Sequence, residues 1–193
     1  MEALIKEMEA YAAENHVPIM QQEGIEFFQK LVEKEEIRSI LELGTAIGYS
    51  AIQLARLHPD IHVVTIERDE ERYQLAVENV KRSGLEEQIT CIFDDIMNVE
   101  LSDSFDCIFI DAAKAQYIRF FERFEANLKP GGVIVSDNLK FHGLVGAPLI
   151  KSRNLRSLVR KIQGYIDYLK TRDDYETVFY ECGDGVAVSR KRI

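Results

Sequence analysis

The sequence predicts an α/β fold: a doubly wound, mostly parallel sheet of seven strands that ends in an antiparallel hairpin. Two observations predict it. Apolar runs alternate with helical segments, and a Gly183-Asp184-Gly185 turn joins the last two apolar runs. A third is the length, since 193 residues suit one domain with one core. We expect a single domain over 1–193, with N-terminal helices over 1–35 and the α/β core over 36–193.

Two amphipathic helices are predicted ahead of the sheet. Apolar residues recur there at helical spacing, at Leu4, Met8, Tyr11 and Ala12 and again at Ile25, Phe28, Leu31 and Val32. Pro18 lies between the two groups and disfavours helix at Val17, so we expect a break in the chain there.

Strands and helices then alternate. The predicted strands cover residues 37–43, 61–66, 89–93, 105–110, 132–136, 176–181 and 186–189, and the predicted helices cover 49–57, 69–83, 117–128 and 150–170. Turn residues separate them: acids open the helix over 69–83, Gly84 ends it, and a Lys-Pro-Gly-Gly turn precedes the strand over 132–136. Helices between parallel strands cover both faces of a sheet.

Composition and charge exclude several classes of protein. The net charge of −9 argues against non-specific coating of nucleic acid, although it permits a local basic site. The longest uncharged stretch, 43–55, is too short to span a bilayer, and the N-terminus has no secretory signal pattern. Cys91, Cys107 and Cys182 share no C-x-x-C spacing, which indicates reduced thiols. We therefore expect a cytoplasmic protein without a membrane partner.

The loop after the first predicted strand is a candidate ligand site, because open α/β sheets bind ligands at the carboxyl ends of their strands. Gly44 lets the backbone turn sharply, and Gly48 lets the next helix start close to the sheet. The G-x-x-x-G spacing departs from the dinucleotide fingerprint, and Glu42 beside the loop suits a cation better than a pyrophosphate. S-adenosylmethionine carries an ammonium and a sulfonium group and no phosphate, so it is the candidate ligand; a glycine loop without a ligand is the alternative.

Acidic residues end the second and third predicted strands. Glu67 lies 23 positions after Gly44, where an acid can accept hydrogen bonds from both ribose hydroxyls of an adenosine. Asp94 and Asp95 close the third strand, where either can accept from an adenine amino group. Each acid alone could be a surface or turn residue, but acids at successive strand ends favour an adenosine site.

Oxygen-bearing side chains end the fourth and fifth predicted strands. Asp111, Asp137 and Asn138 together offer two carboxylates and an amide carbonyl, a set that suits Mg²⁺ or Ca²⁺ and not zinc. Lys114 lies about one helical turn after Asp111 and is a candidate general base. Alternatively, Asp111, Asp137 and Asn138 could cap the helix and the turn that follow them, and Lys114 could be an ordinary surface charge.

These motifs resemble the metal-dependent O-methyltransferases of the catechol and caffeoyl-CoA type. The resemblance rests on residues 41–51 (LELGTAIGYSA), 65–67 (TIE), 109–117 (FIDAAKAQY) and 136–138 (SDN). Within that family, residues 16–20, 44–51 and 141–145 are similar to the bacterial tRNA 5-hydroxyuridine methyltransferases.

The resemblance implies a class I methyltransferase fold of Rossmann-like type and a homodimer. It assigns S-adenosylmethionine to Met20, Gly44, Ser50, Glu67, Asp95, Ile96 and Asp111. It assigns Mg²⁺ to Asp111, Asp137 and Asn138, and proton abstraction to Lys114. The implied reaction is Mg²⁺-dependent methylation of 5-hydroxyuridine at the wobble position of the tRNA anticodon, which gives 5-methoxyuridine.

The acceptor has alternatives. Between residues 151 and 172 lie seven Lys or Arg residues and one acid, and Arg153, Arg156 and Arg160 fall within about 60° of one helix face. Such a face could bind phosphates of a tRNA anticodon loop, or it could be a solvated surface. A small catechol-like acceptor is the second enzymatic hypothesis. A regulatory module that binds adenosine without catalysis is a third, which a bound divalent metal would argue against.

Overall fold

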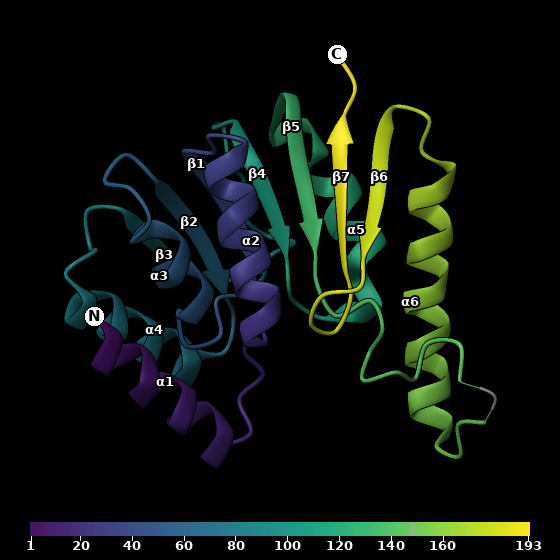
Figure 1. Cartoon of the computed structure of the whole chain (residues 1–193), viewed down its shortest axis with the longest axis horizontal. Coiled ribbons are helices and arrows are strands. Elements are labelled where there is room, and N and C mark those ends of the chain that lie inside the picture. The colour runs from purple at the N-terminus through teal and green to yellow at the C-terminus, as the bar shows by residue number, and fades with distance from the viewer. Residues whose placement is uncertain (148) are drawn as a thin grey trace.

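Seven strands are found in the described part of the chain, residues 1–147 and 149–193 of a computed structural model (Figure 1). They are β1 (Ser39–Leu43), β2 (His62–Glu67), β3 (Ile89–Phe93), β4 (Phe105–Ile110), β5 (Leu128–Ser136), β6 (Tyr175–Tyr180) and β7 (Val186–Lys191). They form one sheet in the order β3-β2-β1-β4-β5-β7-β6. The first five strands of that order are parallel, and β7 is antiparallel to both of its neighbours. The predicted fold class is confirmed.

The helices form a layer on each face of this sheet. They are α1 (Glu2–Glu14), α2 (Gln22–Lys34), α3 (Tyr49–Ala55), α4 (Glu70–Ser83), α5 (Tyr117–Phe124) and α6 (Arg153–Thr171). Helices α1 to α4 share one apolar cluster with the sheet, and α5 and α6 share another on the opposite face. In Figure 1, α1 and α2 lie in front of the sheet and α5 lies behind it.

Three element boundaries differ from the sequence prediction by three or more residues. Strand β5 starts at Leu128, because Leu128 pairs with Phe105 and a register shift separates this pair from the rest of the ladder. The helix before it therefore ends at Phe124 and continues only as a 3₁₀ turn over Glu125–Asn127. Helix α6 starts at Arg153, where the Ser152 hydroxyl accepts the Leu155 amide hydrogen bond at 3.4 Å, and its first turns extend past the sheet (Figure 1).

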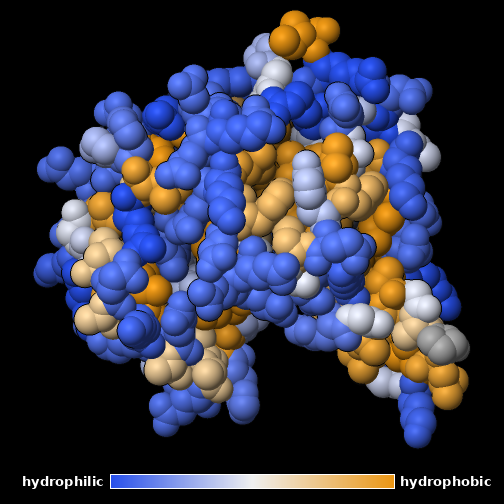
Figure 2. Space-filling model, in the orientation of Figure 1, coloured by the Kyte–Doolittle hydropathy of each residue, from blue (hydrophilic) through white to orange (hydrophobic). Residues whose placement is uncertain are grey.

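The edge strand β6 leaves apolar side chains exposed. Helix α2 covers the middle of the front face, and apolar atoms remain visible beyond it (Figure 2). Val178 and Tyr180 are 44% and 38% exposed, and Tyr180 packs against Phe27 of α2. No helix among the described residues has the length and apolar content needed to cross a lipid bilayer.

Candidate functional site

One pocket of about 270 Å³ opens at the carboxyl edge of the sheet, where β1, β2, β3 and β4 end. Its lining residues are Pro18, Gly44, Ala46, Ile66, Glu67, Arg68, Arg72, Asp95, Ile96, Asp111, Ala112, Ala113, Lys114, Gln116 and Phe120. The structure thus brings together six residues predicted from the sequence, namely Gly44, Glu67, Asp95, Ile96, Asp111 and Lys114.

Gly44 brings the ends of two strands into contact. Its φ is +108°, and a Cβ at this position would lie 2.4 Å from the carbonyl oxygen of Asp111. Its amide donates to the carbonyl of Ile66 at 3.1 Å, which ties the loop to β2. Only glycine fits such a conformation and such a close approach, so the floor of the pocket depends on this residue.

Glu67 connects the end of β2 to the glycine loop. Its Oε2 accepts the amide hydrogen of Ala46 at 2.9 Å, and its Oε1 accepts those of Arg68 and Asp69 at 3.0 and 2.9 Å. A carboxylate has about four acceptor sites, so one remains for a ligand hydroxyl. The Glu67 carboxylate is therefore held rigidly in the wall of the pocket.

Asp95, and not Asp94, lines the pocket. Its Oδ1 accepts the amide hydrogen of Met97 at 2.9 Å, and its Oδ2 lies 3.2 Å from a guanidinium nitrogen of Arg68. The bond from Met97, and after it the charge of Arg68, hold the pKa of Asp95 below its ordinary value. Asp94 is exposed and accepts hydrogen bonds from Asp95 and Asn98.

Glu42 and Ser50 lie beneath the glycine loop. Glu42 is fully buried, and its carboxylate accepts hydrogen bonds from Ser50 and Thr65. Burial raises the pKa of Glu42 to about 7, against the effect of these two hydroxyl groups. Glu42 does not line the pocket, because α3 covers the face of β1 from which its side chain projects. Ser50, assigned to the cofactor, is bonded to Glu42 and is not in the pocket lining.

The three predicted metal ligands converge at the ends of β4 and β5. The Asn138 amide nitrogen lies 3.2 Å from Asp111 Oδ1 and 3.0 Å from Asp137 Oδ2. Burial, and then the charge of Asp111, raise the pKa of Asp137 to about 7, and burial raises that of Asp111. Asp137 is buried and Asp111 is half-buried, and a divalent cation would stabilise these two carboxylates, which repel each other. Rotation of the Asn138 amide would bring its oxygen to the same point. The donor set therefore fits Mg²⁺, although the described residues contain no cluster of three His, Cys, Asp or Glu side chains that could hold a metal.

Two tyrosines that the sequence analysis missed fix the end of β5. The Tyr117 hydroxyl donates to the carbonyl of Asp137 at 3.1 Å, and the Tyr165 hydroxyl lies 2.7 Å from the hydroxyl of Ser136. Both tyrosines are buried, and they come from α5 and α6. Their helical spacing predicts only core positions, since it carries no signal for a hydrogen bond to the end of a distant strand.

Lys114 begins the 3₁₀ turn Lys114–Gln116 at the mouth of the pocket, and its charge opposes the rise in the pKa of Asp111. Arg68 and Arg72 also line the pocket and were not predicted. They lie in the charged segment that follows Glu67, where the sequence pattern does not separate pocket residues from surface residues.

Met20 and the three arginines lie outside the pocket lining. Met20 is buried and packs on Gly24, while Pro18 lines the pocket. Arg153, Arg156 and Arg160 are exposed on α6, and Arg156 also donates to the carbonyls of Ile150 and Lys151 at 2.7 and 3.0 Å.

Comparisons of this chain with known proteins all indicate the same family. A family model described as O-methyltransferase matches residues 1–192. A catechol O-methyltransferase from Niastella koreensis is 35% identical over 62% of this chain, and the match spans 57% of that protein. A caffeoyl-CoA O-methyltransferase from Medicago sativa is 27% identical over 86% of this chain and 72% of its own length.

Solved structures agree with this result. A candidate caffeoyl-CoA O-methyltransferase from Staphylococcus aureus has a TM-score of 0.91 and 38% identity, with 97% of this chain and 91% of that chain covered. An O-methyltransferase from Bacillus cereus in complex with SAH has a TM-score of 0.84 and 26% identity, with 98% and 91% covered.

Proposed function

Because this chain belongs to the O-methyltransferase family, we propose that it transfers the methyl group of S-adenosylmethionine to an oxygen atom of its acceptor. The observation that carries this proposal is the convergence of four strand ends on one pocket that holds Glu67, Asp95 and Lys114. The Bacillus cereus relative in complex with SAH supports the choice of cofactor.

Different pocket residues bind different parts of the cofactor. Glu67 accepts a hydrogen bond from a ribose hydroxyl with the one acceptor site that its three backbone partners leave free. Asp95 accepts from the adenine amino group, beside Ile96. Gly44 allows the loop after β1 to pack closely on the backbone of Asp111, and both residues line the pocket in which the charged sulfonium group would lie near the Asp111 carboxylate.

Asp111, Asp137 and Asn138 would hold Mg²⁺. A divalent cation bound there would supply the positive charge that lowers the pKa of the acceptor hydroxyl to be methylated. The uncharged amine of Lys114 accepts the hydroxyl proton, and the acceptor oxygen then attacks the methyl carbon in line as the carbon–sulfur bond breaks and S-adenosylhomocysteine leaves. Alignment of two bound reactants contributes up to roughly 7–11 kcal/mol to the lowering of such barriers.

The acceptor that we propose is 5-hydroxyuridine at the tRNA wobble position, methylated in the cytoplasm by a homodimer. Its O5 and O4 atoms are neighbours and present the same pair of oxygens as a catechol. Arg153, Arg156 and Arg160 support a nucleic-acid acceptor, because the first turns of α6 extend past the same edge of the sheet that carries the pocket (Figure 1). A small catechol is the second candidate, favoured by the 35% identity to the Niastella koreensis enzyme.

Methyl transfer to tRNA that carries 5-hydroxyuridine tests the acceptor. We expect mass spectrometry to find 5-methoxyuridine, and we expect Arg153→Ala/Arg156→Ala/Arg160→Ala to raise the KM for tRNA while leaving cofactor affinity unchanged. Each lost phosphate contact with a single-stranded loop should make the negative slope of log affinity against log salt less steep by about 0.7.

The matched control for this triple variant removes three exposed charges from the N-terminal helices, as Lys6→Ala/Lys30→Ala/Lys34→Ala. It should leave the KM for tRNA unchanged. Transfer to catechol with no transfer to tRNA would contradict the tRNA assignment and favour the second candidate.

A further inference from the structure

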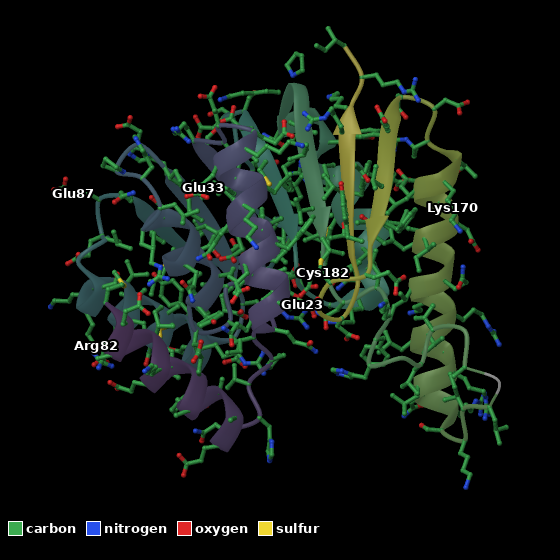
Figure 3. All side chains as sticks on the ribbon, in the orientation of Figure 1. Glu23, Glu33, Arg82, Glu87, Lys170 and Cys182 are labelled. Carbon is green, nitrogen blue, oxygen red and sulfur yellow. The ribbon has the colours of Figure 1, made fainter. Side chains whose placement is uncertain are left out.

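The turn between β6 and β7 lies against the loop that follows the candidate metal ligands. Asp184 in this turn is only 6% exposed, although it is charged and more than 40 residues from the loop in sequence. In Figure 3, Cys182 of the same turn lies beside Glu23 at the start of α2. The turn therefore contacts both the loop after β5 and the start of α2.

Four hydrogen bonds and a close ion pair join the turn to the loop. The Asp184 carboxylate accepts the His142 amide hydrogen at 2.6 Å, and its other oxygen lies 3.4 Å from His142 Nδ1. The Asp184 and Gly185 carbonyls accept the amide hydrogens of Lys140 and Leu139 at 2.7 and 3.0 Å. The Lys140 ammonium donates to the carbonyl of Glu181 at 3.3 Å and also pairs with its carboxylate. Every residue from 139 to 142 except Phe141 is thus tied to the turn.

The loop needs such support because its backbone is strained. Asn138, Phe141 and His142 have φ values of +64°, +46° and +55°, in the left-handed region that side chains other than glycine rarely adopt. Such conformations persist only where the surrounding contacts impose them. Here the contacts come from the turn, which approaches so closely that a Cβ on Gly185 would lie 2.8 Å from Lys140 Cγ.

We propose that Asp184 is a positioning residue, which holds residues 139–142 so that the side chain of Asn138 faces Asp111 and Asp137. This inference rests on the proposed function, since it concerns the metal that these three residues would hold. The Asp184 Oδ2 atom is buried without a hydrogen bond within the described structure, and His142 Nδ1 faces it. The turn accordingly contributes a fixed acceptor to the loop.

Binding of Mn²⁺ alone, followed by electron paramagnetic resonance, tests the role of Asp184. We expect Asp184→Ala to weaken Mn²⁺ binding by about 10-fold, the lower end of the range found when a direct partner of a metal ligand is removed, because Asp184 acts through the loop. Asp184→Asn keeps an oxygen that can accept the His142 amide hydrogen, so it should recover most of this affinity. Binding of S-adenosylmethionine, measured by calorimetry, should be the same in all three proteins.

Asp174→Ala is the matched control, because it removes an aspartate from the opposite end of the same hairpin, where Asp174 pairs with Arg172. It should lower stability and leave Mn²⁺ affinity unchanged. A folded Asp184→Ala protein with wild-type Mn²⁺ affinity would overturn the proposal. Absence of Mn²⁺ binding by the wild-type protein would instead overturn the proposed metal site, and this inference with it.

Discussion

Glu42 is a buried carboxyl group whose hydrogen-bond donors are the hydroxyl groups of Ser50 and Thr65. Its pKa of about 7 exceeds the ordinary value of 4.5, so between these pH values the folded chain retains a proton that the unfolded chain has lost. The free energy of unfolding therefore falls as the pH rises through this window, by up to about 3 kcal/mol from this residue. The loop from Gly44 to Gly48 thus packs on a carboxyl group whose ionisation lowers the stability of the fold.

Glu42→Gln should remove this pH dependence. We expect the variant to gain stability relative to wild type as the pH is raised from about 5 to about 8, because glutamine carries no charge to desolvate. Urea unfolding at both pH values in the presence of EDTA measures the difference. Glu70→Gln, at an exposed position, is the control. Parallel stability curves for Glu42→Gln and wild type would show that Glu42 does not titrate in this range.

The site residues differ in how far the sequence could predict them. Gly44, Glu67, Asp95 and Asp111 follow strands that are apolar runs, so their place at one edge of a parallel sheet follows from the fold class. The direction of the Glu42 side chain could not be predicted. Strand β1 is buried on both faces, so its sequence does not indicate which face a polar residue occupies. The sequence around Asp184 predicts only a hairpin turn, because the residues that Asp184 contacts lie far away in the sequence.

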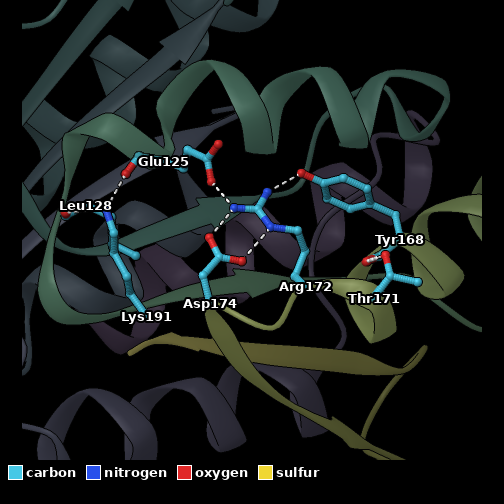
Figure 4. A network of polar contacts seen from close by, with 7 residues as sticks. All are labelled: Glu125, Leu128, Tyr168, Thr171, Arg172, Asp174 and Lys191. Carbon is cyan, nitrogen blue, oxygen red and sulfur yellow. Dashed lines mark hydrogen bonds and ion pairs between the residues drawn. The ribbon is translucent and has the colours of Figure 1, made fainter. Parts of the chain in front are cut away.

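At the scale of elements, Arg172 joins the end of α6 to the helix layer and the hairpin (Figure 4). Its guanidinium pairs with Glu125 and Asp174, each at 2.5 Å, and donates to the hydroxyl of Tyr168. It also lies over the ring of Phe121 at 5.1 Å. Lys191 on β7 donates to the carbonyl of Glu125 at 3.0 Å, so α5, α6 and the hairpin share this network.

Arg172→Ala should destabilise the fold by about 2 kcal/mol, because it leaves the half-buried Glu125 and the exposed Asp174 without their cation and removes the stacking on aromatic rings. Urea unfolding at 25 °C measures the change. Arg160→Ala, at an exposed position on the same helix, should change the stability by less than about 0.5 kcal/mol. Equal free energies of unfolding for the two variants would mean that the network around Arg172 does not stabilise the fold.

Element boundaries show where local sequence signals fail. Residues 129–132 (KPGG) predict a turn, yet β5 begins at Leu128 and continues through them, because pairing with Phe105 compensates for the poor strand propensity of Pro and Gly. The start of α6 is later than periodicity predicts, because the Ser152 cap and not the apolar pattern ends the preceding loop.

At the scale of the whole molecule, the strand order brings together residues from five strand ends that are nearly 100 positions apart in the chain. Asp111 belongs both to the cofactor pocket and to the candidate metal set, so the two sites share one carboxylate. Asp137 and Asn138 lie outside the pocket lining, next to Asp111. This arrangement predicts that the cofactor binds without the metal, whereas methyl transfer requires both.

Methyl transfer with and without chelator, with cofactor binding measured in parallel, tests this claim most directly. The wild-type protein, Asp137→Ala and the control Asp94→Ala are assayed with 5-hydroxyuridine in tRNA and with catechol, in EDTA and after addition of Mg²⁺. We expect EDTA to abolish transfer and Mg²⁺ to restore it in the wild type and in Asp94→Ala but not in Asp137→Ala, with the same affinity for S-adenosylmethionine throughout. Full transfer by the folded wild-type protein in excess EDTA would contradict the account.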